Sequence, residues 1–360
     1  MRLSSVRSLR AILFCCSILG LLTSVLRADL VWNAATGWRV EGGALSGLSG
    51  AEGGTALDQM NKARADEEAG NTRSAIKAYM RIGFRYPNSV YAPEAIYRTA
   101  RLHLLRKEYT KSFQAFQTVL SVYPNTKRFN EIIGEQYRIA SAMLDGARDR
   151  MFFGLLPGFN QRERALGFFE VIVGNAPYSD YAPLSLMNIA RGFQQMKETE
   201  SAIDSLDRMI NNYPQSLLAP DAYIKLAQTH AALVDGPYYD QASTKESITY
   251  FTDFMLLFPS DTNIAAAEKG LDGMKTMLAE SKMRMGDFYF YKRDNFKAAR
   301  VFYNEAITSY PESPVAARAR TRLNEVEAKA AKVAPAAAPA ADGAAAPAPA
   351  PKKKKFFGIF

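Results

Sequence analysis

The sequence contains very few side chains suited to thiol or imidazole chemistry. Its 360 residues include two cysteines, Cys15 and Cys16, and two histidines, His103 and His230. Two adjacent cysteines cannot build a disulfide framework or a thiolate zinc site, and two histidines leave little for a Ser-His-Asp triad. A phosphate-binding glycine loop and a His-Glu-x-x-His motif are also missing. These absences argue against an enzyme, and we expect no cofactor and no metal site.

The central part of the chain lacks an excess of either charge. The whole sequence has 45 basic and 36 acidic residues, a net charge of +9. Four arginines lie in residues 1–28 and four lysines in residues 352–355, and neither segment contains an acidic residue. Without these eight, 37 basic residues face 36 acidic ones. A nearly neutral body does not favour nucleic-acid binding, so we expect protein partners instead.

Long apolar runs are also missing. The apolar stretch at 11–22 follows three arginines and is shorter than the roughly 20 residues that a membrane-spanning helix needs. This pattern predicts a secretory signal peptide over residues 1–28 with cleavage after Ala28, and a retained anchor is the alternative. Phe14 precedes Cys15, where a lipoprotein signal has a small residue, so lipidation is not predicted. We therefore expect an exported, cysteine-free mature protein.

An aromatic–proline step recurs through the middle of the chain and reveals a repeat. The prolines of these steps, with one Ala-Pro among them, are Pro87, Pro124, Pro177, Pro214, Pro259 and Pro311. Counted back from the proline, position minus 12 is always small and position minus 8 is large and mostly aromatic. Together with minus 11, minus 4 and minus 1, these positions form one apolar stripe on a helix. The stripe predicts a packed helix that ends at each proline, because the residue before proline is disfavoured in the α conformation.

A polar residue two positions after each proline marks the start of the next helix. These residues, which we expect to cap it, are Ser89, Thr126, Ser179, Ser216, Asp261 and Ser313. Pro87 and Pro124 are 37 residues apart, close to the roughly 34 residues of a tetratricopeptide unit. The pattern predicts an all-α, right-handed tetratricopeptide-repeat solenoid of about six helix pairs over residues 56–332.

Two stretches depart from the repeat spacing. The surplus between Pro124 and Pro177 contains a hydrophobic loop at 151–159. Its candidate docking residues are Phe152, Phe153, Leu155, Leu156 and Phe159. Either this loop plugs its own repeat or it is exposed for docking, since insertions in solenoids often contact partners. The stretch 265–291 either lengthens the first helix of the sixth repeat or adds another helix.

The first helix of each pair lines the concave surface of such a solenoid, where partners bind. Candidate peptide-binding residues on these helices are Tyr97, Arg101, Tyr137, Arg138 and Arg191. Aromatic and arginine side chains suit peptide recognition through stacking and carboxylate contacts. The alternative is that the two tyrosines belong to the core between repeats.

Two segments flank the repeats. Residues 29–55 are glycine-rich and contain Trp32 and Trp38, which predicts an N-terminal linker. Its tryptophans either dock on a partner or on lipid headgroups, or they cover the apolar face of the first repeat. Residues 333–351 are almost entirely alanine and proline, which predicts a disordered spacer.

The segment 352–360 combines positive charge with apolar residues in the sequence KKKKFFGIF. The candidate membrane-tip residues are Lys352, Lys353, Lys354, Lys355, Phe356, Phe357 and Phe360. Three interpretations remain open. The segment has no function; or it contacts a membrane, with lysines on anionic headgroups and phenylalanines inserted; or it occupies a site that reads the aromatic end of outer-membrane barrel proteins.

Three stretches carry a further pattern: residues 78–100 (AYMRIGFRYPNSVYAPEAIYRTA), residues 150–182 with their Phe-Phe-Gly insertion, and residues 287–313. Together they resemble the BamD family, the tetratricopeptide component of the outer-membrane β-barrel assembly machinery. The resemblance implies a non-enzymatic scaffold on the periplasmic face of the outer membrane. It also implies binding to the barrel insertase and to unfolded outer-membrane proteins. The alternative is a general periplasmic tetratricopeptide adaptor in envelope or cell-division coordination.

Overall fold

The computed structural model describes residues 29–33, 35, 37–41, 51–151, 156–157, 161–239 and 241–333. The predicted signal peptide, the Ala/Pro spacer from residue 334 onward and the segment 352–360 lie outside these residues. The chain forms two compact units, Met1–Thr229 and His230–Phe360, which are described separately.

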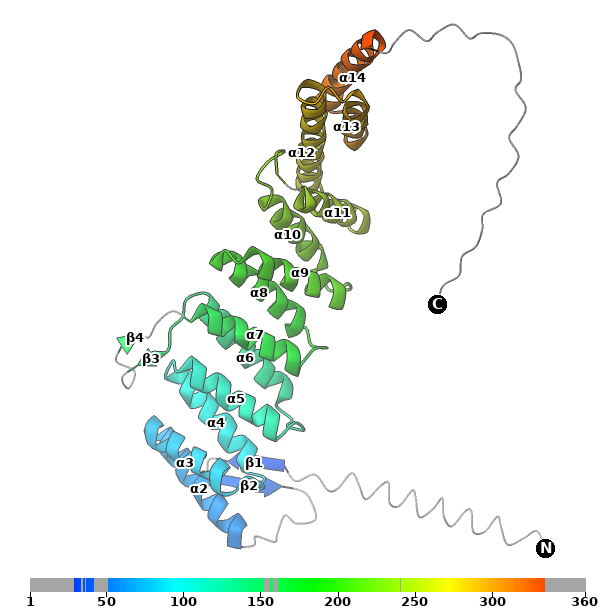
Figure 1. Cartoon of the computed structure of the whole chain (residues 1–360). Coiled ribbons are helices and arrows are strands. Elements are labelled where there is room, and N and C mark those ends of the chain that lie inside the picture. The colour runs from blue at the N-terminus through cyan, green and yellow to red at the C-terminus, as the bar shows by residue number, and fades with distance from the viewer. Residues whose placement is uncertain are drawn as a thin grey trace, which may run out of the picture. The chain divides into compact units, whose positions relative to one another are not determined.

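The first unit consists of consecutive helix pairs (Figure 1). In chain order these are α2 (Ala51–Glu68) with α3 (Thr72–Arg85), α4 (Ala92–Leu105) with α5 (Tyr109–Val122), α6 (Phe129–Leu144) with α7 (Arg162–Asn175), and α8 (Tyr181–Met196) with α9 (Thr199–Asn212). Helix α10 (Ala219–Ala232) follows at the end of the unit. Helix α6 contacts both α7 and α8, so the first helices of successive repeats stack in one layer and the second helices in another.

The second unit contains α11 (Ala242–Leu257), α12 (Ile264–Tyr291), α13 (Phe296–Ser309) and α14 (Pro314–Val333). Helix α12 is continuous over 28 residues, so the stretch 265–291 lengthens the first helix of the sixth repeat. Helices α13 and α14 pack on α12 around buried Tyr303 and Phe290. The described residues thus form thirteen helices, α2 to α14, which confirms the predicted all-α tetratricopeptide fold.

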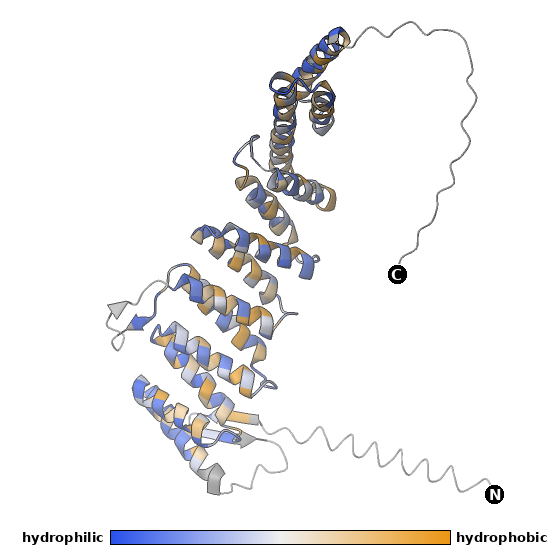
Figure 2. Cartoon of the chain, viewed as in Figure 1, coloured by the Kyte–Doolittle hydropathy of each residue, from blue (hydrophilic) through white to orange (hydrophobic). Residues whose placement is uncertain are grey.

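The apolar stripe on the second helices forms the core of each repeat, and in Figure 2 apolar and polar residues alternate around the helices. All residues at minus 12 and minus 8 are buried, from Ala75 and Tyr79 in the first repeat to Ala299 and Tyr303 in the sixth. The prediction for minus 4 is wrong at Gly83, Val173, Met255 and Ile307, which are only half-buried. Position minus 5 is buried instead, because it lies about 100° from minus 4 and continues the line of minus 12 and minus 8. These residues are Ile82, Val119, Ile172, Met209, Phe254 and Ala306.

The predicted capping residues organise the turns between repeats rather than the helix ends. The N-cap positions of α4, α6 and α8 have no side-chain capping bond. Ser89 instead accepts a bond from the N–H of Tyr91, two residues on, at 3.3 Å. Helix α4 starts later than predicted because a short turn precedes it. In this turn the Ser89 N–H donates a hydrogen bond to the Tyr86 carbonyl. At α14 the prediction is correct, since Ser313 Oγ accepts the Ala316 N–H at 3.1 Å.

The tyrosine of the Tyr-Pro step links successive repeats. Tyr123 Oη donates to the Pro87 carbonyl at 2.6 Å, and Tyr213 Oη donates to the Pro177 carbonyl at 2.8 Å. Partial burial raises the pKa of both phenols. Each bond therefore joins the turn of one repeat to the turn of the preceding repeat.

Removing one of these hydroxyls should weaken the first unit. Tyr213→Phe keeps the ring but deletes the bond to Pro177, and we expect a loss of about 1 kcal/mol in the free energy of unfolding. Urea denaturation followed by circular dichroism measures this loss. Tyr178→Phe is the matched control because its ring is fully exposed. Equal losses in the two variants would mean that the bond contributes nothing specific.

A β-hairpin covers the first repeat. Strands β1 (Asp29–Asn33) and β2 (Gly37–Glu41) are antiparallel, with Trp32 opposite Trp38. Because side chains alternate along a strand, Leu30, Trp32 and Trp38 share one face, which packs against α2 and its neighbours. Trp38 is buried, and its backbone N–H donates to Asn61 Oδ1 at 2.8 Å.

The hairpin corrects the prediction of a linker over residues 29–55. Part of that segment is strand, and α2 begins at Ala51 rather than at residue 56. A two-stranded ribbon is barely stable alone, so the helices beneath it hold it in place. Gly37 permits the close approach, since its φ is +74° and a Cβ would lie 2.6 Å from Asn61 Oδ1.

Candidate functional site

Three of the predicted groove residues form a row of arginines. Arg101, Arg138 and Arg191 lie on α4, α6 and α8, the first helices of three successive repeats. Each stands fourteen residues after the proline that precedes its helix, so the three occupy equivalent positions. Arg138 exposes 75% of its side chain, and the other two are about half exposed. We call these three residues the arginine row.

Carboxylates from the same layer of helices accompany the arginine row. Arg101 and Arg138 both approach Glu135 Oε1, at 3.5 and 3.3 Å. Arg191 pairs with Asp145 at 2.9 Å. Glu135 is buried, whereas both partners of the Arg191–Asp145 pair are exposed. An exposed ion pair contributes only about 0–1 kcal/mol, so Arg191 can exchange Asp145 for a carboxylate or carbonyl of a bound peptide at little cost.

The structure places Tyr97 in the packing between repeats rather than in a groove. Its ring is buried, meets Phe116 edge-on at 5.7 Å and lies 4.4 Å from the Arg128 guanidinium. Its hydroxyl donates to Glu131, and burial together with this bond raises the pKa of Tyr97 to about 12. A ligand cannot reach this side chain without separating α4 from α6.

Tyr137 is half-buried between α6 and α8. Its hydroxyl accepts a bond from Asn188 Nδ2 at 2.8 Å, and its ring lies 5.3 Å from that of Tyr181 and 5.7 Å from that of Phe169. The structure thus separates the five candidate residues into an exposed arginine row and two tyrosines that contact neighbouring helices.

The sequence interpretation missed a network of ion pairs between repeats. Arg128, at the start of α6, binds Glu94 of α4 at 3.1 Å and Glu131 at 2.8 Å. Burial opposes ionisation of Glu131, but hydrogen bonds from Tyr97 and Arg128 outweigh it and lower its pKa. Glu94 and Arg128 are 34 residues apart, as are Arg101 and Glu135. Opposite charges at the repeat spacing are the sequence signal that identifies such pairs.

The predicted docking loop is anchored at its N-terminal end. The Arg150 N–H donates to the Lys107 carbonyl at 3.1 Å, and Thr110 donates its N–H to Asp149 at 3.0 Å. Strands β3 (Arg150–Met151) and β4 (Leu156–Pro157) pair across the loop. Phe152, Phe153, Leu155 and Phe159 lie outside the described residues, and Leu156 is described only by its backbone. Whether the loop plugs or docks stays a prediction.

His103 is buried and contacts a carboxylate. Its Nδ1 lies 2.5 Å from Glu108 Oε2 at the turn between α4 and α5. Burial lowers the pKa of His103 despite this carboxylate, so the neutral ring donates Nδ1–H to Glu108. In the part of the chain that the structure describes, no group of three or more His, Cys, Asp or Glu side chains is placed to hold a metal ion. Nor is any helix in those same ranges long and apolar enough to cross a membrane.

The stacked helix pairs and their recurring core define a tetratricopeptide-repeat protein, and residues 94–126 match the tetratricopeptide-repeat family model. Residues 160–337 match the family model YfiO, described as an outer membrane lipoprotein. The predicted resemblance to the BamD family is confirmed by this match, and the fold is that of a tetratricopeptide protein.

Three relatives carry the name outer membrane protein assembly factor BamD. The protein of Rickettsia prowazekii (strain Madrid E) is 26% identical over 163 residues, which cover 45% of this chain and 64% of that protein. The protein of Xylella fastidiosa (strain Temecula1) is 21% identical over 44% of this chain and 57% of its own length. The protein of Caulobacter vibrioides is 23% identical over 35% of this chain and 41% of its own length. The matched part is thus under two thirds of each relative.

Solved tetratricopeptide structures superpose only loosely on this chain. A thermophilic tetratricopeptide protein of Thermus thermophilus gives a TM-score of 0.28 at 15% identity, covering 60% of this chain and 98% of that one.

Proposed function

We propose that the chain is a non-enzymatic scaffold for outer-membrane protein assembly. In this role it binds the barrel-assembly machinery and unfolded outer-membrane proteins at the periplasmic face of the outer membrane. The family match and the name of its three relatives support this role. The predicted signal peptide agrees with this role. Strand β1 begins at Asp29, the residue after the predicted cleavage point, so cleavage there leaves the hairpin intact.

The arginine row is the observation that carries the binding mechanism. One guanidinium recurs at the same position on three successive first helices, so the row has the regular spacing of the repeat. An extended peptide that runs across α4, α6 and α8 meets one arginine at each step. Arginine binds carboxylates through two parallel bonds and also donates to backbone carbonyls. This arrangement suits an unfolded chain, which offers carbonyls and scattered carboxylates rather than one shaped surface.

Removing the arginine row should abolish most of this binding. The ligand is an outer-membrane barrel protein that is denatured in urea and then diluted. We expect the full chain with the triple substitution Arg101→Ala, Arg138→Ala, Arg191→Ala to bind it with a Kd about tenfold higher or more. The reason is that hydrogen bonds to charged groups contribute about 1.5–3 kcal/mol each. Fluorescence anisotropy of the labelled barrel protein measures the Kd.

A matched triple variant controls for the loss of charge. Arg85→Ala, Arg164→Ala, Arg208→Ala removes three arginines from the second helices α3, α7 and α9. An equal loss of affinity in both triples would indicate non-specific attraction and overturn the mechanism. Co-purification from solubilised envelope tests the role itself, since recovery of periplasmic proteins without any barrel insertase would favour the general adaptor.

A further inference from the structure

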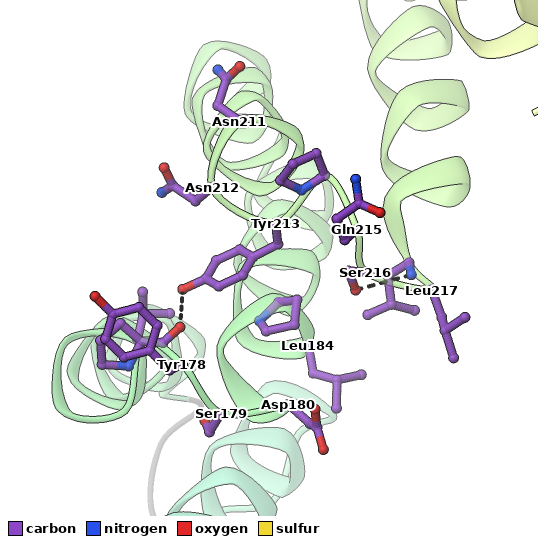
Figure 3. Close-up of a pocket in the computed structure, with 15 residues that line it drawn as sticks. Tyr178, Ser179, Asp180, Leu184, Asn211, Asn212, Tyr213, Gln215, Ser216 and Leu217 are labelled. Atoms are coloured by element: carbon purple, nitrogen blue, oxygen red, sulfur yellow. Dashed lines mark hydrogen bonds between the residues drawn. The ribbon is translucent and has the colours of Figure 1, made fainter. Parts of the chain in front are cut away.

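The first unit has a pocket between two neighbouring inter-repeat turns. Its volume is about 1120 Å³, and its walls come from the turn before α8 and the turn before α10. Figure 3 shows Tyr178 and Tyr213 side by side, with the bond from the Tyr213 hydroxyl drawn between the turns. Pro177, Pro183 and Pro214 add apolar surface. None of the three residues of the arginine row lines this pocket, so it is a separate site.

Two apolar side chains of the pocket face solvent. Tyr178 is fully exposed, and Leu217 exposes 97% of its surface. They come from opposite turns. Tyr178 directly follows its proline, and the equivalent residues at the other five turns are polar: Asn88, Asn125, Gln215, Ser260 and Glu312. An exposed aromatic ring where the repeat otherwise has a polar residue points to a ligand rather than to folding.

The charge of the pocket is negative. Asp180 lines it, and no lysine or arginine is among the described residues that do. The Asp180 carboxylate makes no capping bond at the start of α8. The nearest arginine to act on Tyr213 is Arg208, whose charge is already met by two hydrogen bonds to Glu170, at 2.7 and 2.8 Å. The pocket therefore favours a partner that carries a positive charge.

The polar groups of the pocket indicate the conformation of that partner. The side-chain amides of Asn211, Asn212 and Gln215 line it, and all three residues are exposed. Amides donate to backbone carbonyls, and a polyproline II helix leaves its carbonyls free because it has no internal hydrogen bonds. An α-helix uses most of its carbonyls itself, and an added β-strand needs a sheet edge. The walls here are helix ends and turns, which offer no such edge.

We propose that this pocket binds a proline-rich segment of a partner protein, in the polyproline II conformation and next to a basic residue. The proline rings of that segment pack on Tyr178, Tyr213 and Leu217, and its basic side chain faces Asp180. Grooves lined by aromatic rings bind such segments because the polyproline II helix is already formed and loses little entropy on binding. The bond from Tyr213 to the Pro177 carbonyl holds one of the two rings in place before the partner arrives.

Fluorescence anisotropy of a labelled oligoproline peptide that ends in two arginines tests the proposal on the full chain. We expect the double variant Tyr178→Ser, Leu217→Ser to raise the Kd of this peptide about fivefold or more, because a few exposed anchors carry most of the binding energy. The control Phe84→Ser, Leu105→Ser removes two other exposed apolar side chains of the same unit, outside the pocket, and should leave the Kd unchanged. Equal Kd values in the unaltered chain and the double variant would overturn the proposal.

A second peptide tests the conformation of the partner. It keeps the two arginines, but glycine and serine replace the prolines, so the polyproline II helix is lost. We expect the unaltered chain to bind it about fivefold more weakly or worse, since the flexible peptide must be ordered on binding. Equal affinity for the two peptides would show that the pocket reads charge alone and would contradict the polyproline II assignment.

A charge reversal tests the contact with Asp180. Asp180→Lys should weaken binding of the arginine peptide about two- to fivefold and strengthen binding of an oligoproline peptide that ends in glutamates by a similar factor. The same change with both peptides would rule out this contact. The triple variant of the arginine row should bind the arginine peptide as the unaltered chain does, whereas a loss there would place the peptide on the row instead of in the pocket.

Discussion

Replacing Phe169 with alanine should destabilise the first unit by about 3–5 kcal/mol, the cost of deleting a fully buried aromatic side chain. Phe169 occupies position minus 8 of the third repeat and is completely buried on α7. Its ring meets Tyr137 of α6 at 5.7 Å. The variant therefore opens a cavity between the two helices of one repeat and weakens the contact with the next.

Hydrogen exchange measures this loss better than a single melting curve, because two compact units need not unfold together. We expect faster exchange in α6, α7 and α8 and little change in α13 and α14. Phe84→Ala is the matched control on α3, since Phe84 exposes 89% of its surface and should cost less than about 0.5 kcal/mol. A similar loss in both variants would contradict the assignment of minus 8 to the core.

Trp38→Ala should release the hairpin from the first repeat. Trp38 is buried in the core cluster of α2, α3 and α4, and its ring lies 5.4 Å from Trp32 and 5.3 Å from the Arg98 guanidinium. Truncating a buried tryptophan costs about 3–5 kcal/mol. A two-stranded ribbon is only marginally stable by itself, so this loss should exceed the free energy that keeps the hairpin docked. We expect the strands to undock and the apolar face of α2 to become exposed.

Exchange at the backbone amides of α2 and β2 reports this release, and binding of a hydrophobic dye reports the exposed surface. Tyr178→Ala is the control, because it removes an aromatic ring of the same unit that is fully exposed. Terminal repeats of a solenoid need a cover for their outer face, so the effect should concentrate at α2. Unchanged exchange in α2 would show that the hairpin does not serve as this cover.

The repeat architecture could be predicted because its signals are local and recur six times. Proline after an aromatic residue ends a helix through backbone sterics alone, and the small residue at minus 12 recurs with the same spacing. The choice of minus 4 over minus 5 is wrong in four of the six repeats, because both positions are apolar. Only the direction in which the neighbouring helix lies decides which of them is buried.

The candidate site could be predicted only in part. Arg101, Arg138 and Arg191 share one register that can be counted from the prolines, and the structure places them together on the layer of first helices. Tyr97 was paired with them because tyrosine suits both a groove and a core. Its bond to Glu131 comes from a residue 34 positions away, which the local pattern around Tyr97 does not reveal.

By itself, the sequence determined the helical repeat, its number of units and the concentration of its net charge in two short segments, because these depend on periodicity and composition. Tertiary structure alone decided that Trp38 is buried, that Tyr97 packs between repeats and that Tyr178 is fully exposed. The physical reason is that burial depends on which surfaces of neighbouring repeats meet. Three aromatic residues with similar intrinsic preferences therefore acquire different roles from their neighbours.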